Sequence, residues 1–186
     1  MKNILIVQLI IHIWFLNTIN AQSNMDSWRI FSPNEKVIGI EHQGSMIYTA
    51  FELGILTYDV DYKEQSLWTN ANHLSDFRIS ALGKHEPTNT IIIGYDNGNI
   101  DLIQNEQVYN IPGIKLASIQ GIKSITKITS HEQYVYVNTG FGIVIVDPKR
   151  KEIKDTYYPS STEEIMSSQI IGDTLYALTT TRLLKC

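Results

Sequence analysis

Residues 91–103 read Ile-Ile-Ile-Gly-Tyr-Asp-Asn-Gly-Asn-Ile-Asp-Leu-Ile, two apolar runs separated by the polar segment Asp96-Asn97-Gly98-Asn99. β-Branched residues such as Ile pack well on a pleated sheet and are common in strands. Asn and Gly tolerate the positive φ angles that the tight turns of β-hairpins require. The stretch therefore predicts two antiparallel strands joined by a turn at Asn97-Gly98.

The apolar pair that opens this hairpin belongs to a repeat that runs along the chain. Successive copies of the pair lie 44, 44 and 40 residues apart: Ile47-Tyr48, Ile91-Ile92, Val135-Tyr136 and Leu175-Tyr176. Seven residues after each pair begins comes a turn position followed by an apolar run: Gly54, Gly98, Gly142 and Arg182. Another apolar residue precedes each pair by ten residues, or by twelve in the second copy: Val37, Ile79, Ile125 and Ile165. A register kept at three positions in four copies indicates an internal repeat.

Each repeat divides into four short strands. In the third copy we predict strands at 125–130, 133–138, 142–147 and 153–157, with short polar or charged turns between them. Strands of this length with such connections form antiparallel hairpins. Repeats of about 40–50 residues with four strands each are typical of β-propeller blades. A solenoid is the alternative, although solenoid repeats are usually shorter.

We therefore predict an all-β fold of β-propeller blades with four antiparallel strands each. The repeat units are about residues 37–78, 79–124, 125–164 and 165–186, which amounts to about three and a half blades, an incomplete propeller. The composition agrees, since 52 residues are Ile, Val or Thr and only 6 are Ala. Because propellers close with about four to eight blades, we expect the sequence to be the first portion of a longer protein. On its own it is expected to be poorly soluble or self-associating.

The first 21 residues have the layout of a secretory signal peptide. Lys2 gives a positive start, residues 4–16 are almost wholly apolar, and Ala21 is the small residue before a cleavage site. The apolar run is shorter than the roughly 18 residues that span a bilayer. No cysteine lies near the cleavage site, so a lipid anchor is not expected. We predict removal of residues 1–21 and export of residues 22–186.

Charge and cysteine content exclude several functional classes. The chain has 15 Lys and Arg against 19 Asp and Glu, a net charge of −4, and its one basic cluster is Lys149-Arg150-Lys151. Nucleic-acid binding normally requires many cations on one face, so it is not expected. The sole cysteine is Cys186, which excludes an internal disulfide and a cysteine-based zinc site.

Metal-binding residue types are scattered along the sequence. Asp96 to Asp101 faintly resembles a calcium loop, but it lacks the glycine at the sixth position and the later Glu of an EF-hand. We interpret the carboxylates as turn residues: Asp59, Asp61, Asp96, Asp101 and Asp147. The histidines after the signal peptide are not paired at metal-ligand spacing and are interpreted as surface turn residues: His42, His73, His85 and His131. No metal site and no cofactor are predicted.

The sequence also lacks a recognisable catalytic motif. Gly140-Phe141-Gly142 resembles part of a dinucleotide-binding loop, but it leads into the predicted strand 142–147 rather than into the helix that such a site needs. Neither a Gly-x-Ser-x-Gly elbow nor a Walker motif occurs. Cys186 has no evident activating partner. We therefore assign no catalytic or cofactor-binding residue and predict that the chain is not an enzyme.

Aromatic residues provide the one candidate binding surface. Tyr48, Tyr136 and Tyr176 recur at the repeat position, where packing between repeats explains them. Four others lie outside it: Trp28, Trp68, Tyr157 and Tyr158. They could form a sugar- or protein-binding surface, although packing within the blades is the favoured interpretation.

Several segments together resemble one known family. They are Trp28-Arg29, residues 54–59, 74–76 with 79–81, 93–103 with 109–112, 140–144 and 152–157. From Trp28 to the end of the sequence they are similar to the N-terminal β-propeller of the PorZ family of the type IX secretion system. Residues 93–103 followed by Tyr109-Asn110-Ile111-Pro112 are the most specific part. Leu74-Ser75-Asp76 is also similar to the propeller repeats of two-component sensors, which is a more generic match.

The resemblance implies a non-catalytic scaffold at the cell surface. Members of the family are exported to the outer-membrane surface, join an attachment complex with a sortase, and help supply anionic lipopolysaccharide for anchoring cargo proteins. The implied partners are the sortase, associated outer-membrane proteins and anionic lipopolysaccharide; the alternative location is the periplasm. Full-length members carry a second propeller and a C-terminal sorting domain, which this sequence does not include. No ligand-binding motif is carried over, so the binding residues stay unassigned.

Two other functions stay open from the sequence. One is the extracytoplasmic sensor propeller of a two-component regulator, which would require a transmembrane helix and a kinase further along the gene. The other is a propeller hydrolase or lyase whose catalytic groups lie in other blades.

Overall fold

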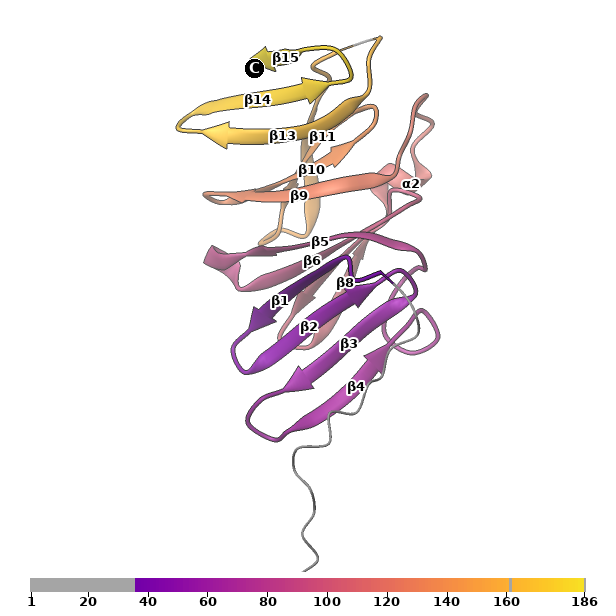
Figure 1. Ribbon diagram of the computed structural model, residues 1–186, viewed down its shortest axis with the longest axis vertical. Helices are drawn as coiled ribbons and strands as arrows, with labels where there is room; N and C mark the ends of the chain where they lie inside the picture. The colour runs from indigo at the N-terminus through magenta and orange to yellow at the C-terminus, as the bar shows by residue number, and fades with distance from the viewer. Residues whose placement is uncertain (1–35, 161, 186) are drawn as a thin grey trace, which may run out of the picture. The chain divides into compact units, whose positions relative to one another are not determined.

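The computed structural model describes residues 36–160 and 162–185, whose regular secondary structure is almost wholly short antiparallel strands (Figure 1). The predicted signal peptide, residues 1–21, and Trp28 lie outside the described residues. The strands form three four-stranded sheets and one three-stranded sheet, and in each sheet the neighbouring strands follow one another along the chain. Meandering sheets of this kind are the blades of β-propellers. The prediction of an all-β fold with four-stranded antiparallel blades is confirmed.

We number the four sheets as blades 1 to 4 in chain order. Blade 1 contains β1 (Gly39–Gln43), β2 (Met46–Phe51), β3 (Gly54–Asp59) and β4 (Glu64–Trp68). Blade 2 contains β5 (Ile79–His85), β6 (Thr90–Tyr95), β7 (Ile100–Gln104) and β8 (Gln107–Ile111). Blade 3 contains β9 (Ile125–His131), β10 (Tyr134–Thr139), β11 (Gly142–Asp147) and β12 (Glu152–Tyr157). Blade 4 contains β13 (Ile165–Ile171), β14 (Thr174–Thr179) and β15 (Leu183–Lys185).

The repeat positions found in the sequence have fixed places in the blades. All four apolar pairs lie in the second strand of their blade, and the strands predicted for the third copy begin and end within one residue of those observed. Ile79, Ile125 and Ile165 each open a first strand and are buried, whereas Val37 precedes β1 and is exposed. The longer spacing in the second copy has a local cause, because the 3-10 helix η1 (Glu86–Thr88) lengthens the connection between β5 and β6.

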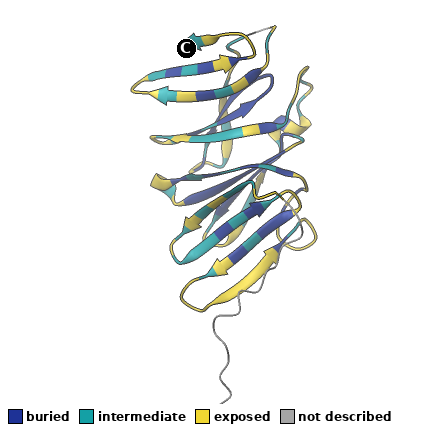
Figure 2. Cartoon of the chain, viewed as in Figure 1, coloured by how far each residue is buried: buried dark blue, intermediate teal, exposed yellow. Residues whose placement is uncertain are grey.

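Buried apolar clusters join each blade to the next. One cluster contains Tyr48, Ile55 and Trp68 of blade 1 together with Ile91, Ile93 and Tyr95 of blade 2. Ile92 belongs instead to the cluster that blade 2 shares with blade 3, and a smaller cluster joins blades 3 and 4. Successive residues of a strand point to opposite faces, so β6 must be apolar on both. This two-sided burial explains the Ile-rich composition. Figure 2 shows by contrast that exposed residues are concentrated on the last strand of blade 1, β4.

Two glycines of blade 2, Gly83 in β5 and Gly94 in β6, allow this blade to approach the first strand of blade 3 closely. A Cβ atom built on Gly94 would lie 2.5 Å from Cγ2 of Ile125, and one built on Gly83 would lie 2.7 Å from Cγ2 of Ile128. Any side chain at these positions would overlap with β9. Blade 2 is followed by the one-turn helix α2 (Gly113–Leu116). In the described part of the chain, no helix is long and apolar enough to cross a membrane.

Candidate functional site

The turn predicted at Asn97-Gly98 is present between β6 and β7. The side-chain oxygen of Asn97 accepts a hydrogen bond from the N–H of Asn99 at 3.0 Å, and Gly98 has a φ of +84°. Asp59 and Asp147 also behave as turn residues, because each accepts hydrogen bonds from the backbone N–H groups of the residues two and three positions further along the chain. These turn interpretations are confirmed.

A buried carboxylate, Asp76, ties this turn to the segments before and after blade 2. It accepts hydrogen bonds from Nζ of Lys115 at 2.6 Å, Nδ2 of Asn97 at 2.7 Å and Nδ2 of Asn99 at 3.2 Å. Only 4% of its side chain is exposed. Burial acts to raise the pKa of Asp76, but the hydrogen bonds from Lys115 and Asn97 outweigh it and hold the pKa below its ordinary value.

The second carboxylate of this network, Asp101, is not the turn residue that the sequence suggested. It lies within β7, is fully buried, and accepts hydrogen bonds from the hydroxyl of Tyr95 at 2.7 Å, Nδ2 of Asn110 at 2.9 Å and the N–H of Ser75 at 2.8 Å. Burial raises the pKa of Tyr95 well above its ordinary value, and the negative charge of Asp101 is the second cause of this shift. The segment that most specifically resembles the PorZ family therefore forms a buried network that holds blade 2 together.

The histidines occupy four different environments. His85 is fully buried, with Nδ1 2.7 Å from the hydroxyl of Thr88 and Nε2 2.9 Å from the carbonyl oxygen of Glu132, so its interpretation as a surface residue is wrong. His73 stacks on Trp68, their ring centroids 4.5 Å apart. His42 is exposed, and His131 ends β9. Among residues 36–160 and 162–185, no three His, Cys, Asp or Glu side chains gather as metal ligands would.

The aromatic residues outside the repeat position divide into two groups. Trp68 is 6% exposed and packs edge-on against Tyr48, as the packing interpretation predicts. Tyr157 and Tyr158 are 45% and 61% exposed, so packing in the blades does not explain them. Each lines a different cavity beside blades 3 and 4.

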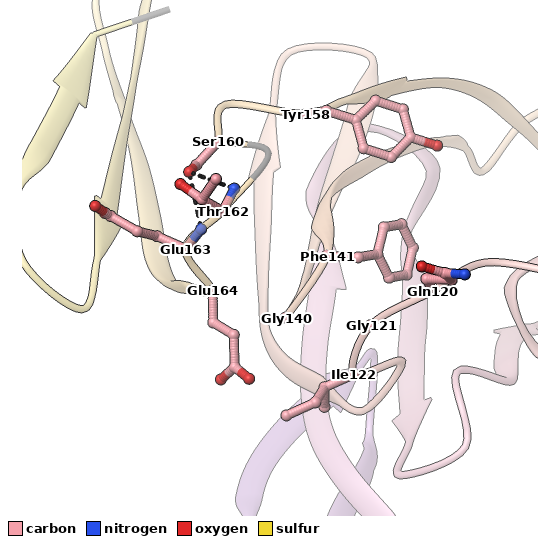
Figure 3. A pocket seen from close by; sticks show the side chains of 10 residues that line it. All are labelled: Gln120, Gly121, Ile122, Gly140, Phe141, Tyr158, Ser160, Thr162, Glu163 and Glu164. Carbon is pink, nitrogen blue, oxygen red and sulfur yellow. Dashed lines mark hydrogen bonds between the residues drawn. The ribbon is translucent and has the colours of Figure 1, made fainter.

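Tyr158 lines a cavity of about 390 Å³, which we call the interblade cavity (Figure 3). Three segments enclose it: the loop 120–122, the turn between β10 and β11, and the connection between β12 and β13. A Cβ atom on Gly140 would lie 2.8 Å from Cβ of Ile122, so the first two segments approach as closely as they do because residue 140 is glycine. The N–H of Ile165 donates to the carbonyl oxygen of Gly140 at 3.1 Å and joins the third segment to them.

The walls of the interblade cavity differ in chemistry. Phe141 and Tyr158 form an aromatic wall, with ring centroids 6.1 Å apart. Facing them, the connection between the blades carries Glu163 and Glu164, as Figure 3 shows. This wall is preorganised, because the hydroxyl oxygen of Ser160 accepts hydrogen bonds from two backbone N–H groups, those of Thr162 and Glu163.

A second cavity, of about 330 Å³, is lined by residues of β9, β10, β12, β13 and β14 and of the turns between them. Its lining includes Tyr134, Tyr136 and Tyr157, with the acidic residues Glu132 and Asp173. Nζ of Lys154 lies 3.8 Å from the ring centroid of Tyr134. Burial raises the pKa of Tyr136 above its ordinary value, and the neighbouring Tyr157 adds to the effect.

Sequence reasoning did not find either cavity. Gly140-Phe141-Gly142 does not form a dinucleotide-binding loop, because Gly142 opens the strand β11 and not a helix. The one available signal for the interblade cavity was Tyr158 beside the Pro- and Ser-containing connection that leads to blade 4.

Comparison with known proteins identifies the family. The family model described as the type IX secretion system PorZ N-terminal β-propeller domain matches residues 47–186. The chain belongs to this family. The matched region includes blades 2, 3 and 4 and most of blade 1, together with both cavities.

Solved structures with the same fold include a PorZ protein and bacterial sensor domains. PorZ of Porphyromonas gingivalis, an essential bacterial surface component of its type IX secretion system, is 19% identical with a TM-score of 0.71. The extracellular domain of the putative hybrid two-component system BT4673 from B. thetaiotaomicron is 20% identical with a TM-score of 0.64. In both cases the match covers 81% of this chain and 20% of the other, so this PorZ-family chain spans about a fifth of their length.

A computationally designed protein, Ika4, has the same fold at a similar size. It is 12% identical with a TM-score of 0.62, and the match covers 85% of this chain and 94% of Ika4. At these identities the likeness shows the fold alone. Comparison with curated protein sequences gives no significant match.

Proposed function

We propose that this chain is a non-catalytic binding part of a surface scaffold of the type IX secretion system. In this role it is exported, exposed at the outer-membrane surface, and joined to a sortase and associated outer-membrane proteins in an attachment complex. The complex assists the anchoring of cargo proteins to anionic lipopolysaccharide. The observation that carries the proposal is the match of the PorZ propeller model to residues 47–186.

The chemistry of the described residues supports binding rather than catalysis. The most deeply buried ionisable groups are engaged within the blades, as shown by Asp101 with Tyr95 and by His85 with Thr88 and Glu132. Two exposed aromatic residues, Tyr157 and Tyr158, line instead the cavities beside blades 3 and 4. Solvent-open cavities with aromatic walls are typical of recognition sites.

Deletion of the intact gene tests the proposal. We expect cargo proteins to leave the cell surface and to appear in the culture medium, and we expect the restored gene to reverse the effect; immunoblots of cell and medium fractions measure both. Unchanged anchoring of cargo in the deletion strain would overturn the proposal. Proteinase K added to intact cells tests the location, since a surface protein is digested and a periplasmic one is protected.

A sensor propeller is the second candidate, because BT4673, assigned to a putative two-component system, shares the fold. Deletion would then change transcription of a defined set of genes and leave cargo anchoring intact. A hydrolase or lyase is the third candidate. Turnover of polysaccharide or ester substrates by the full-length protein would overturn the non-catalytic part of the proposal.

A further inference from the structure

The interblade cavity has a charge pattern that the proposed function does not account for. Its lining includes two glutamates, Glu163 and Glu164, but no lysine and no arginine. The opposite wall is made by the rings of Phe141 and Tyr158 (Figure 3). The cavity is therefore acidic on one side and aromatic on the other.

The two glutamates play different parts. Glu163 accepts hydrogen bonds from the hydroxyls of Thr179 and Thr181, and its Oε1 lies 3.4 Å from Nε of Arg182. Its charge is therefore already paired within blade 4. In Figure 3 its carboxylate points away from the aromatic rings. Glu164 is exposed, and no described residue makes a hydrogen bond or an ion pair with it. Glu164 thus provides the cavity with a free carboxylate.

We propose that the interblade cavity binds an arginine side chain presented by a partner protein. A guanidinium group pairs with a carboxylate through two parallel N–H groups, which fits the free carboxylate of Glu164; in Figure 3 this carboxylate lies on the Ile122 side of the cavity, away from the Tyr158 ring. The methylene stem of arginine would then lie along the aromatic wall of Phe141 and Tyr158. A volume of about 390 Å³ is sufficient for such a side chain. An anion would be repelled, and a neutral apolar group would leave Glu164 unpaired.

The second cavity supplies an internal comparison. It also combines tyrosines with carboxylates, and there the chain's own Lys154 lies over the ring of Tyr134. Likewise, Nζ of Lys151 lies 3.2 Å from the ring centroid of Tyr109. Lysines of this chain thus cover two of its outer tyrosines, whereas Tyr158 is 61% exposed and has no described lysine or arginine over its ring. The face of Tyr158 is therefore open to the side chain of a partner.

The inference is independent of the type IX secretion role, since a sensor propeller could use the same cavity. The test measures binding of an acetylated, amidated peptide Gly-Ser-Arg-Ser-Gly to the full chain. Saturation-transfer NMR observes the peptide and tolerates association of the protein. We expect transfer to the arginine side chain, and at least about tenfold weaker binding when citrulline, which has the same shape without the charge, replaces arginine.

Variants locate the binding. We expect Glu164→Gln to weaken binding about tenfold and Tyr158→Ala about fivefold. The matched controls are Glu132→Gln and Tyr157→Ala in the second cavity, which should change the affinity less than about twofold. Equal binding of the citrulline peptide, or equal effects of the two sets of variants, would overturn the proposal. The guanidinium ion alone should bind at least about tenfold more weakly than the peptide, because it lacks the stem; equal binding would contradict recognition of a side chain.

Discussion

At the residue scale, Asp76 shows how a single carboxylate fixes the entry to a blade. Its oxygens receive hydrogen bonds from Lys115, Asn97 and Asn99, and almost none of the side chain reaches solvent. Asp76→Asn keeps the shape but removes the charge and turns one acceptor into a donor. We expect the free energy of unfolding to fall by about 2 kcal/mol, because hydrogen bonds to charged groups are stronger than neutral ones. Urea unfolding of the full chain at pH 7 measures it.

The same substitution has a defined pH dependence. Because the folded pKa of Asp76 lies below its unfolded value, its charge stabilises the fold above pH about 4, and this contribution is lost as the pH falls through the folded pKa. The difference in the free energy of unfolding between the wild type and Asp76→Asn should therefore shrink as the pH is lowered from about 5 to about 3, the range in which this carboxyl group becomes protonated. The exposed Asp61→Asn is the control and should have almost no effect at either pH. A difference that stays constant with pH would contradict the assigned role.

At the element scale, the contact of β6 with β9 depends on the absence of a side chain at Gly94. A Cβ atom there would lie 2.5 Å from Cγ2 of Ile125. Gly94→Ala should destabilise the chain by about 1–3 kcal/mol, as expected when a methyl group is forced into a packed core. Ile125→Ala removes the opposing methyl group and leaves a cavity. The double variant should therefore be at least about 1 kcal/mol more stable than the sum of the two effects predicts.

Gly44→Ala provides the control for this pair. Gly44 has a φ of +61° and nothing within 4 Å of the position of a Cβ atom, so its substitution introduces backbone strain but no overlap. Gly44→Ala should lower the free energy of unfolding by about 1 kcal/mol, and this effect should simply add to that of Ile125→Ala. Coupling of equal size in both pairs, measured by urea unfolding of the three single and two double variants, would show that the Gly94 contact is not responsible.

Strands and turns could be predicted from the sequence because their signals are local. Short runs of apolar, mostly β-branched residues and the Asn97-Gly98 turn suffice to place β6, β7 and the four strands of blade 3. The burial of His85 could not be predicted, because its partner Glu132 lies 47 residues away in the next blade. The interblade cavity could not be predicted from the sequence for the same reason. Phe141 and Tyr158 meet across two connections, and no periodic pattern records such a contact.

At the scale of the whole molecule, two blade faces carry exposed apolar side chains. In blade 1, Ile40 and Leu67 are exposed on the face opposite to the cluster shared with blade 2, at corresponding positions of the register. In blade 4, Leu178 pairs with Leu183, and both are exposed, whereas the next pair, Ala177 and Leu184, packs toward blade 3. In the described residues, every other blade face packs against a neighbouring blade through buried apolar side chains.

These two faces predict head-to-tail association of the chain with itself. The face of blade 4 in one copy can cover the face of blade 1 in the next, and a contact between two different faces can continue from copy to copy. Leu178→Glu should raise the concentration at which association begins at least about tenfold. The substitution removes a leucine that the contact between copies would bury, and it adds a charge there. Tyr62→Glu, at an exposed turn of blade 1 away from both faces, should leave that concentration unchanged. Sedimentation velocity over a range of protein concentrations distinguishes the two variants. A wild-type chain that stays monomeric at every concentration would contradict the prediction, as would equal shifts for both variants.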